Sequence, residues 1–222
     1  MNIAVIGAGN VGGNLAACFA KAGHKVVLAA SPEIEKRLQD RAKEIGHGVE
    51  VALAAEAVKK SEVVVLSVMW AGVDTALAQA GDLSDKVVLD TTNQYGPEGL
   101  VELETSIALY NQGRMPKARL VRAFNMLTAE YQKEVANGKH QPVAMFFAAE
   151  DERARQVADQ LIPATGFQPV YLGGWDQAQH IEAPAGMLVG KSYRPTDARA
   201  IAQALLEGNS KLATEIATSK QL

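Results

Sequence analysis

The chain is poor in the features that mark secreted, membrane-spanning and nucleic-acid-binding proteins. Its only cysteine is Cys18, so no disulfide can form within the chain, as is usual in a reducing compartment. Apolar runs such as Val63 to Val68 have the length of a strand and are far shorter than the roughly 18–20 residues that cross a bilayer. A net charge of -3 gives no general attraction to nucleic acid or to an anionic membrane. We therefore expect neither kind of partner.

The composition is that of a folded globular protein. Of 222 residues, 48% are hydrophobic and 21% are charged, which is the usual balance for such proteins. A chain of this length can bury a core that needs no disulfide or metal. The four histidines are scattered, and none has metal-ligand spacing to Cys18 or to another histidine, so we expect no metal site. The first residues show no secretory signal, and we expect a cytoplasmic protein.

Short runs rich in Val and Ile alternate with segments of helical spacing. The runs lack polar alternation, which is typical of parallel strands covered on both faces. The expected strands are Asn2–Ile6, Lys25–Ala29, Val49–Ala52, Glu62–Val68, Val87–Asp90, Arg119–Phe124, Val143–Ala148 and Gln168–Leu172. The expected helices are Asn10–Ala22, Glu33–Ile45, Val73–Ala80, Thr128–Ala136 and Asp151–Ile162. This order predicts an α/β fold with a doubly wound, mostly parallel sheet of the Rossmann type.

The pattern changes after about Gly173. The rest of the chain has no convincing strand, whereas Thr196–Glu207 and Ser210–Ser219 have helical spacing. We therefore expect one α/β domain over residues 1–173 and a small helical extension over residues 174–222. The extension is expected to pack on the cleft of the sheet or to form a homodimer interface.

The strongest motif is the run Gly7-Ala8-Gly9-Asn10-Val11-Gly12, which directly follows the first strand and opens an amphipathic helix. The first glycine permits a tight turn, and the second lets the backbone approach a pyrophosphate. The third lets the helix pack closely on the strand. Backbone N–H groups at the start of the helix then face the negative charge of the ligand. The motif therefore predicts a nicotinamide dinucleotide site, whereas a plain glycine-rich turn is the simpler alternative.

The end of the second strand decides between NAD and NADP. An NAD site usually has an Asp or Glu there, about ~20 residues beyond the glycines, which binds the ribose 2′-hydroxyl. Here the chain reads Ala29-Ala30-Ser31-Pro32, and the nearest acid, Glu33, lies beyond a proline. Without a repelling carboxylate a 2′-phosphate is admissible. Ser31 could then donate a hydrogen bond, and Lys36 or Arg37 could add positive charge, unless they only form a solvated helix face. NADP is thus favoured and NAD stays open.

Three further segments, each at a strand end, carry a family resemblance. They are Leu66-Ser67-Val68-Met69-Trp70, Val87-Val88-Leu89-Asp90-Thr91-Thr92-Asn93 and Val121-Arg122-Ala123-Phe124-Asn125. Together with the glycine turn, they resemble the NADPH-dependent reductases named after the deazaflavin coenzyme F-420, over roughly residues 1–175. The "Ala-Phe-Asn" strand end is the most specific part. The rest is shared with many Rossmann reductases.

The resemblance implies roles for several of these residues. It places Ala8 to Val11 on the pyrophosphate, Ser67, Val68, Met69 and Trp70 beside the nicotinamide ribose, and Asn93 and Asn125 near the nicotinamide ring. The same location follows from the rule that ligands bind outside the carboxyl ends of strands in open α/β sheets. The simpler alternative is that Ser67, Asn93 and Asn125 only tie up loop backbone. Two positions depart from the family. Ser31 stands where members of the family often have an arginine that binds the 2′-phosphate. Met69 stands where they have a proline.

Proton donors for catalysis are not evident. His180 with Glu182 is the best titratable pair, and Lys191 or Tyr193 could reach the cleft from the tail. Asn125 and His180 are the only catalytic candidates. Trp70 and Trp175 could stack on a flat ring, although packing is an equally good explanation. Hydride transfer between two ring cofactors depends mainly on holding the rings close and parallel.

We therefore expect an NADPH-dependent oxidoreductase that passes hydride to a small molecule with a planar flavin-like or deazaflavin ring. Two alternatives stay open. One is a reductase of a small imine or carbonyl compound, whose pocket would be formed by the helical tail across a dimer. The other is a non-catalytic NADP-sensing module that binds the cofactor without a hydride acceptor.

Overall fold

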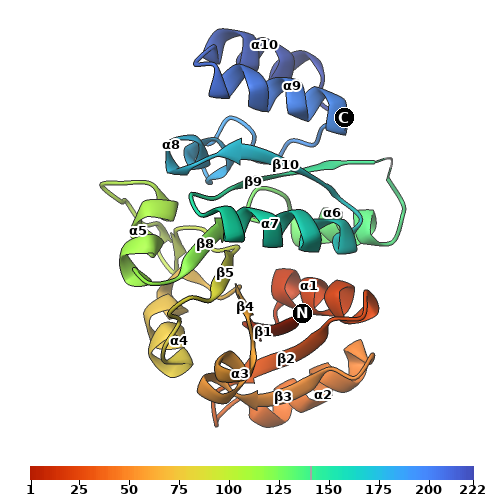
Figure 1. The fold of residues 1–222 in the computed structure, drawn as a ribbon, viewed down its shortest axis with the longest axis vertical. Coiled ribbons are helices and arrows are strands. Elements are labelled where there is room, and N and C mark those ends of the chain that lie inside the picture. Colours follow the sequence, from red (N-terminus) through yellow and green to blue (C-terminus); the bar gives the residue numbers. More distant parts are fainter. Residues whose placement is uncertain (141) are drawn as a thin grey trace.

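The computed structural model describes residues 1–140 and 142–222 (Figure 1). In these residues one sheet of eight strands has the order β10-β9-β8-β5-β4-β1-β2-β3, and a two-stranded hairpin lies apart from it. The strands of the large sheet are β1 (Asn2–Ile6), β2 (Lys25–Ala30), β3 (Glu50–Leu53), β4 (Val63–Leu66), β5 (Val87–Asp90), β8 (Arg119–Arg122), β9 (Ala144–Ala148) and β10 (Gln168–Gly173). The hairpin consists of β6 (Tyr95–Gly96) and β7 (Gly99–Leu100).

Helices follow most of the strands. The longer ones are α1 (Asn10–Lys21), α2 (Glu35–Ile45), α3 (Ala54–Lys60), α4 (Val73–Ala80), α5 (Ile107–Arg114), α6 (Ala129–Ala136), α7 (Glu152–Leu161), α9 (Pro195–Leu206) and α10 (Ser210–Ser219). Shorter turns of helix are η1 (Trp70–Gly72), η2 (Ile162–Thr165), α8 (Trp175–Ala178) and η3 (Gln179–Ile181). No helix of the described residues has both the length and the apolar character that a membrane span requires.

The predicted α/β architecture is confirmed. Strands β1 to β5 and β8 are parallel, and those at the centre are buried on both faces, which explains their unbroken apolar sequences. The chain reverses direction in the sheet after β3, so right-handed crossovers place α1 and α2 on one face and α3 on the other. The edge strands β9 and β10 are parallel to each other, but β9 meets β8 in the antiparallel sense, through Arg122 and Ala148.

Several element boundaries differ from the sequence prediction. The second helix begins at Glu35 rather than Glu33, because the residues before it form a turn. The strand that begins at Arg119 ends at Arg122 rather than Phe124, because Phe124 has a φ of +62° and leaves the extended conformation. The strand expected over Val49–Ala52 is shifted by one residue, to Glu50–Leu53. Boundaries of this kind depend on individual backbone angles, which apolar patterns do not encode.

Two of the longer helices of the described residues, α3 and α5, were not predicted. The first follows β3 without a break residue. The second contains Asn111 and Gly113, which are weak helix formers, but Ser106 caps it by accepting a hydrogen bond from the Leu109 N–H. Ser106 is a typical N-cap residue, so the start of this helix could have been predicted from the sequence.

The tail after Gly173 has two parts. Helix α8 contacts β9, β10 and α5 and continues into η3, whose Ile181 carbonyl accepts from Asn125. Helix α9 packs on β9 and β10, and α10 packs on α9 (Figure 1). Tyr193 fastens the second part to the sheet: its carbonyl accepts from the Ala144 N–H, and its hydroxyl donates to the Ala217 carbonyl. Division at residue 173 and a homodimer stay predictions.

Candidate functional site

The turn between β1 and α1 owes its shape to two of its glycines. Gly7 has a φ of +93°, and a Cβ there would lie 2.3 Å from the Ser67 carbonyl oxygen. A Cβ on Gly12 would lie 1.9 Å from the carbonyl oxygen of Gly7. Any larger residue at either position would push the turn away from the neighbouring backbone. The tight turn and the close packing of helix on strand are therefore as predicted.

Gly9, the N-cap of α1, is different because nothing lies within 4 Å of where its Cβ would be. No side chain caps the helix, and the first turn contains no acid. The first N–H groups of α1 thus face an accessible surface with the positive end of the helix dipole behind them. Ala8, Asn10 and Val11 complete this surface, and none of them is buried. It has the form of an anion-binding turn.

The end of β2 corrects one premise of the sequence prediction. Ser31 does not point an unengaged hydroxyl outward, because it donates a hydrogen bond to the carboxylate of Glu33. This bond is the main reason that the pKa of Glu33 lies below its usual value. A carboxylate therefore does stand at the strand end, two residues beyond Ser31. Lys36 and Arg37 are exposed on the first turn of α2.

The residues after β4 differ in how far their side chains are bonded, buried or exposed. The Ser67 hydroxyl accepts from Thr91 at 3.0 Å, which joins the ends of β4 and β5, and Val68 contacts the core. Met69 is 73% exposed, whereas Trp70 is only 6% exposed. The guanidinium of Arg114 lies 4.5 Å from the centre of the Trp70 ring. The indole is thus used in packing, which was the alternative to stacking on a ring, and a role of Trp70 beside the cofactor stays a prediction.

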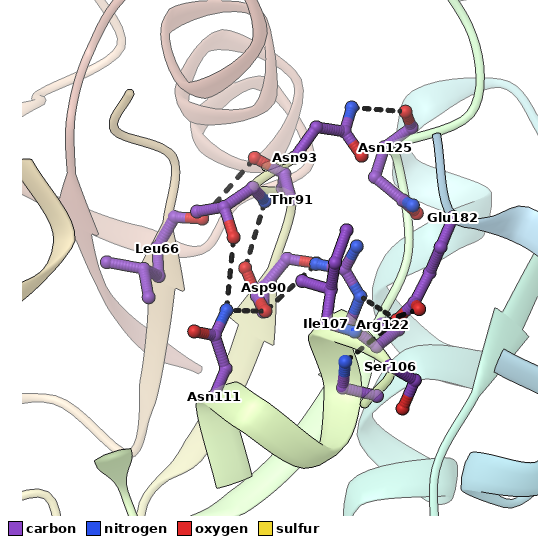
Figure 2. Close-up of polar contacts among 12 residues, drawn as sticks. Leu66, Asp90, Thr91, Asn93, Ser106, Ile107, Asn111, Arg122, Asn125 and Glu182 are labelled. Atoms are coloured by element: carbon purple, nitrogen blue, oxygen red, sulfur yellow. Dashed lines mark hydrogen bonds and ion pairs between the residues drawn. The ribbon is translucent and has the colours of Figure 1, made fainter. Parts of the chain in front are cut away.

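Asn93 and Asn125 come together, as predicted, at the ends of β5 and β8 (Figure 2). The Asn93 amide donates to the Asn125 backbone carbonyl at 2.9 Å, and the Asn125 amide donates to the Ile181 carbonyl at 2.6 Å. Within the described residues, neither side-chain oxygen has a hydrogen-bond donor, although both are buried. A buried acceptor without a donor costs about 1–3 kcal/mol. The described residues leave four other buried side-chain atoms in the same state, in Ser61, Arg122 and Gln132, so the position of the two asparagines at the strand ends is what marks them.

The loop that carries Asn125 is held in an unusual conformation. Phe124 is fully buried with a φ of +62°, a region that bulky residues rarely adopt. The side-chain amide of Gln132, on α6, donates to the carbonyls of Phe124 and Leu127 at 2.9 and 2.8 Å. These two bonds offset the strain and fix the direction of Asn125. The sequence analysis did not predict this role of Gln132, because the fold determines which carbonyls its side chain reaches.

A buried cluster of charged side chains lies beside the two asparagines (Figure 2). Arg122 is fully buried between Asp90, at 2.9 Å, and Glu182, at 3.4 Å. Asn111 also donates to the Asp90 carboxylate, at 2.7 Å. Asp90 and Arg122 could have been noticed as charges at the ends of otherwise apolar strands. The cluster joins β5, β8, α5 and the tail.

Glu182 is not half of a proton-transfer pair with His180, which corrects the sequence interpretation. Its carboxylate accepts from the N–H groups of Ile107 and Ala108, at 3.0 and 2.8 Å, and so caps α5 in addition to pairing with Arg122. In the described part of the chain, no hydrogen bond or ion pair joins His180 to Glu182. Burial lowers the pKa of His180. The carboxylate is therefore a structural group.

Lys191 and Tyr193, which could have reached the cleft, form hydrogen bonds with other backbone carbonyls. The ammonium of Lys191 donates to the Met187 carbonyl, and Tyr193 is fully buried with its hydroxyl on Ala217. Burial raises the pKa of Tyr193 to about 12. Trp175 is 8% exposed and packs in the core. Tyr193 and Trp175 are therefore packing residues, and the Lys191 ammonium is bonded within its own segment.

The fold and the turn at α1 define a dinucleotide-binding protein of the Rossmann type. Residues 2–94 match the family of coenzyme F420-dependent NADP oxidoreductases. The resemblance inferred from the sequence is thereby confirmed, over a shorter part of the chain than expected. The predicted enzyme class, an NAD(P)H-dependent reductase, agrees with the NADP oxidoreductases of this family.

Solved structures share the fold of this chain. A hypothetical protein of Sinorhizobium meliloti is 24% identical over 87% of this chain and 95% of its own, with a TM-score of 0.77. A candidate F420-dependent NADP-reductase of Arthrobacter sp. is 26% identical over 80% and 87%, with a TM-score of 0.69. A reductive aminase of Aspergillus terreus in complex with NADPH is 18% identical over 95% and 62%, with a TM-score of 0.58, and shares the fold.

Proposed function

We propose that this chain is an NADPH-dependent reductase that transfers hydride from the nicotinamide to a planar flavin-like or deazaflavin acceptor. The observation that carries the proposal is the turn at Gly9, where an uncapped helix N-terminus faces open space beside two glycines, Gly7 and Gly12, whose added Cβ would collide with backbone. This geometry fits the pyrophosphate of a dinucleotide. The family match over residues 2–94 supports the same cofactor.

The rest of the cofactor would extend along the carboxyl ends of the strands. The backbone from Ser67 to Met69 would border the nicotinamide ribose. Asn93 and Asn125, at the ends of β5 and β8, would lie near the nicotinamide ring. When bound, the nicotinamide supplies a hydride, which carries two electrons and one proton to the acceptor. The residues of the chain hold and orient it.

Two features of the site favour a ring acceptor. Of the residues that could donate a proton, Glu182 and Tyr193 are engaged elsewhere in the described structure, and burial lowers the pKa of His180, so this histidine carries a proton less readily. A carbonyl or imine reductase depends on such a donor, whereas a flavin-like ring can take its second proton from water. Met69, which follows β4, and Tyr95, which follows Asn93 by two residues, are also exposed, by 73% and 41%, and their side chains suit a flat ring.

The test is a comparison of Gly9→Val with a matched control, Gly113→Ala. Neither glycine has an atom within 4 Å of the added Cβ, so both variants should fold. We expect G9V to lose NADPH binding by at least roughly tenfold, since a side chain then fills the pyrophosphate position. G113A should bind normally. Wild-type protein mixed with NADPH and a free flavin or deazaflavin should oxidise the cofactor.

Each other outcome would contradict a different part of the proposal. Normal NADPH binding by G9V would remove the turn from the site. Binding without oxidation by any ring acceptor would exclude the reaction and favour the sensing module. Turnover with imines in preference to rings would favour the imine reductase.

A further inference from the structure

A turn after β2 places the carboxylate of Glu33 at the edge of the proposed cofactor site. The Ser31 carbonyl accepts from the Ile34 N–H at 3.1 Å, and Pro32 occupies the second position of this turn, where its fixed φ is favourable. Glu33 is the third residue, and the turn folds its carboxylate back onto the Ser31 hydroxyl. Proline therefore does not remove the acid from the strand end, as the linear sequence suggests, but brings it there.

The strand register places this pair next to the glycine turn. Ile6 of β1 lies beside Ala29 of β2, so the residues that follow each strand, Gly7 on one and Ser31 on the other, begin neighbouring turns at one edge of the sheet. In Rossmann folds the adenosine ribose lies at this edge, and an acid there accepts a hydrogen bond from its 2′-hydroxyl. Glu33 is exposed and accessible to such a ligand.

Charge at this edge opposes a 2′-phosphate. The phosphate would bring up to two negative charges toward the Glu33 carboxylate. The single hydroxyl proton of Ser31 is already donated to that carboxylate, so it cannot serve the phosphate at the same time. Lys36 and Arg37 stand on the next turn and can offset the repulsion only in part, because exposed charges are screened by solvent.

We infer that Glu33, held by Ser31, reads the 2′ position of the adenosine ribose and shifts the selectivity of this chain from NADPH toward NADH. The carboxylate accepts a hydrogen bond from a 2′-hydroxyl and repels a 2′-phosphate. The chain thus binds both dinucleotides, and Glu33 sets the ratio of the two affinities. The inference rests on the proposed dinucleotide site.

The experiment measures the dissociation constants of NADPH and NADH for the wild type, Glu33→Ala and Glu35→Ala. Glu35 is the control because it is an acid two residues away, with its carboxylate bonded by Gln39 on the same helix. We expect E33A to bind NADPH about three- to tenfold more tightly and NADH about threefold more weakly. E35A should leave the ratio unchanged. Binding is read from nicotinamide fluorescence, so no turnover is needed.

The outcomes separate this inference from the proposed function. An unchanged ratio in E33A, or an equal change in E33A and E35A, would overturn the role of Glu33 and leave the cofactor site intact. If the wild type bound neither dinucleotide, the proposed function itself would fail, and the inference with it. A ratio that changes in E33A alone would support both.

Discussion

The side-chain amide of Asn93 donates a hydrogen bond to the backbone carbonyl of Asn125 at 2.9 Å, and so joins the ends of two adjacent strands, β5 and β8. The Asn125 amide extends the connection to the tail through Ile181. Three segments far apart in the sequence therefore meet at one point. A ligand that contacts one asparagine is positioned by all three segments.

Replacement of Asn93 by Ala tests this connection. We expect kcat/KM with NADPH to fall by about ten- to a hundredfold, because the ring is no longer positioned and Asn125 loses its tie. The free energy of unfolding should fall by only about 1 kcal/mol, the net value of one hydrogen bond. Asn137→Ala, at an exposed helix end, is the control and should change neither. Equal losses of stability and of activity in N93A would indicate a structural role alone.

Gly12→Ala should behave in the opposite way from G9V. Its added Cβ would lie 1.9 Å from the Gly7 carbonyl oxygen, a contact that only a shift of the backbone can relieve. Overpacking of this kind costs about 1–3 kcal/mol or more. Urea unfolding of G12A should therefore show a clear loss of stability, while G9V should unfold like the wild type. The geometry would be refuted if G12A were as stable as G9V.

Glu182→Ala tests the buried charge cluster. The change removes one partner of Arg122 and the cap of α5. Removing one partner of a buried ion pair costs about 3–5 kcal/mol, because the other charge stays buried. The free energy of unfolding, measured with urea, should fall by that amount, and Glu207→Ala on the exposed end of α9 should leave it unchanged. A loss below 1 kcal/mol in E182A would mean that Asp90 alone satisfies the arginine.

Acid pH should destabilise the fold through two histidines. Burial lowers the pKa of both His24 and His180, so each binds a proton less readily in the folded state than in the unfolded state. Their contribution is therefore fully present above the unfolded value of about 6.5 and decreases as the pH falls below it. Urea unfolding at pH 7.5 and at pH 5.5 should show this loss. It should be smaller in His24→Gln and His180→Gln, and an unchanged loss in both variants would exclude the two histidines as its source.

The sequence by itself determined the order of elements, the parallel character of the central sheet and the glycine turn. These features depend on local properties: apolar runs, helical spacing and the absence of a Cβ at Gly7 and Gly12. The ends of the strands at Asn93 and Asn125 could be predicted too, because the carboxyl ends of parallel strands meet at one edge. Helix α5 was missed, since part of its cap comes from Glu182, 75 residues away from Ile107.

Only the tertiary structure decided which side chains are free. Trp70, Glu182 and Tyr193 each looked available in the sequence, and packing, ion pairing or burial engages each of them. The turn at Ser31 likewise brought Glu33 to an edge from which the linear order had excluded it. The reason is physical: whether a polar group can act on a ligand depends on which partners already satisfy it, and those partners come from distant parts of the chain.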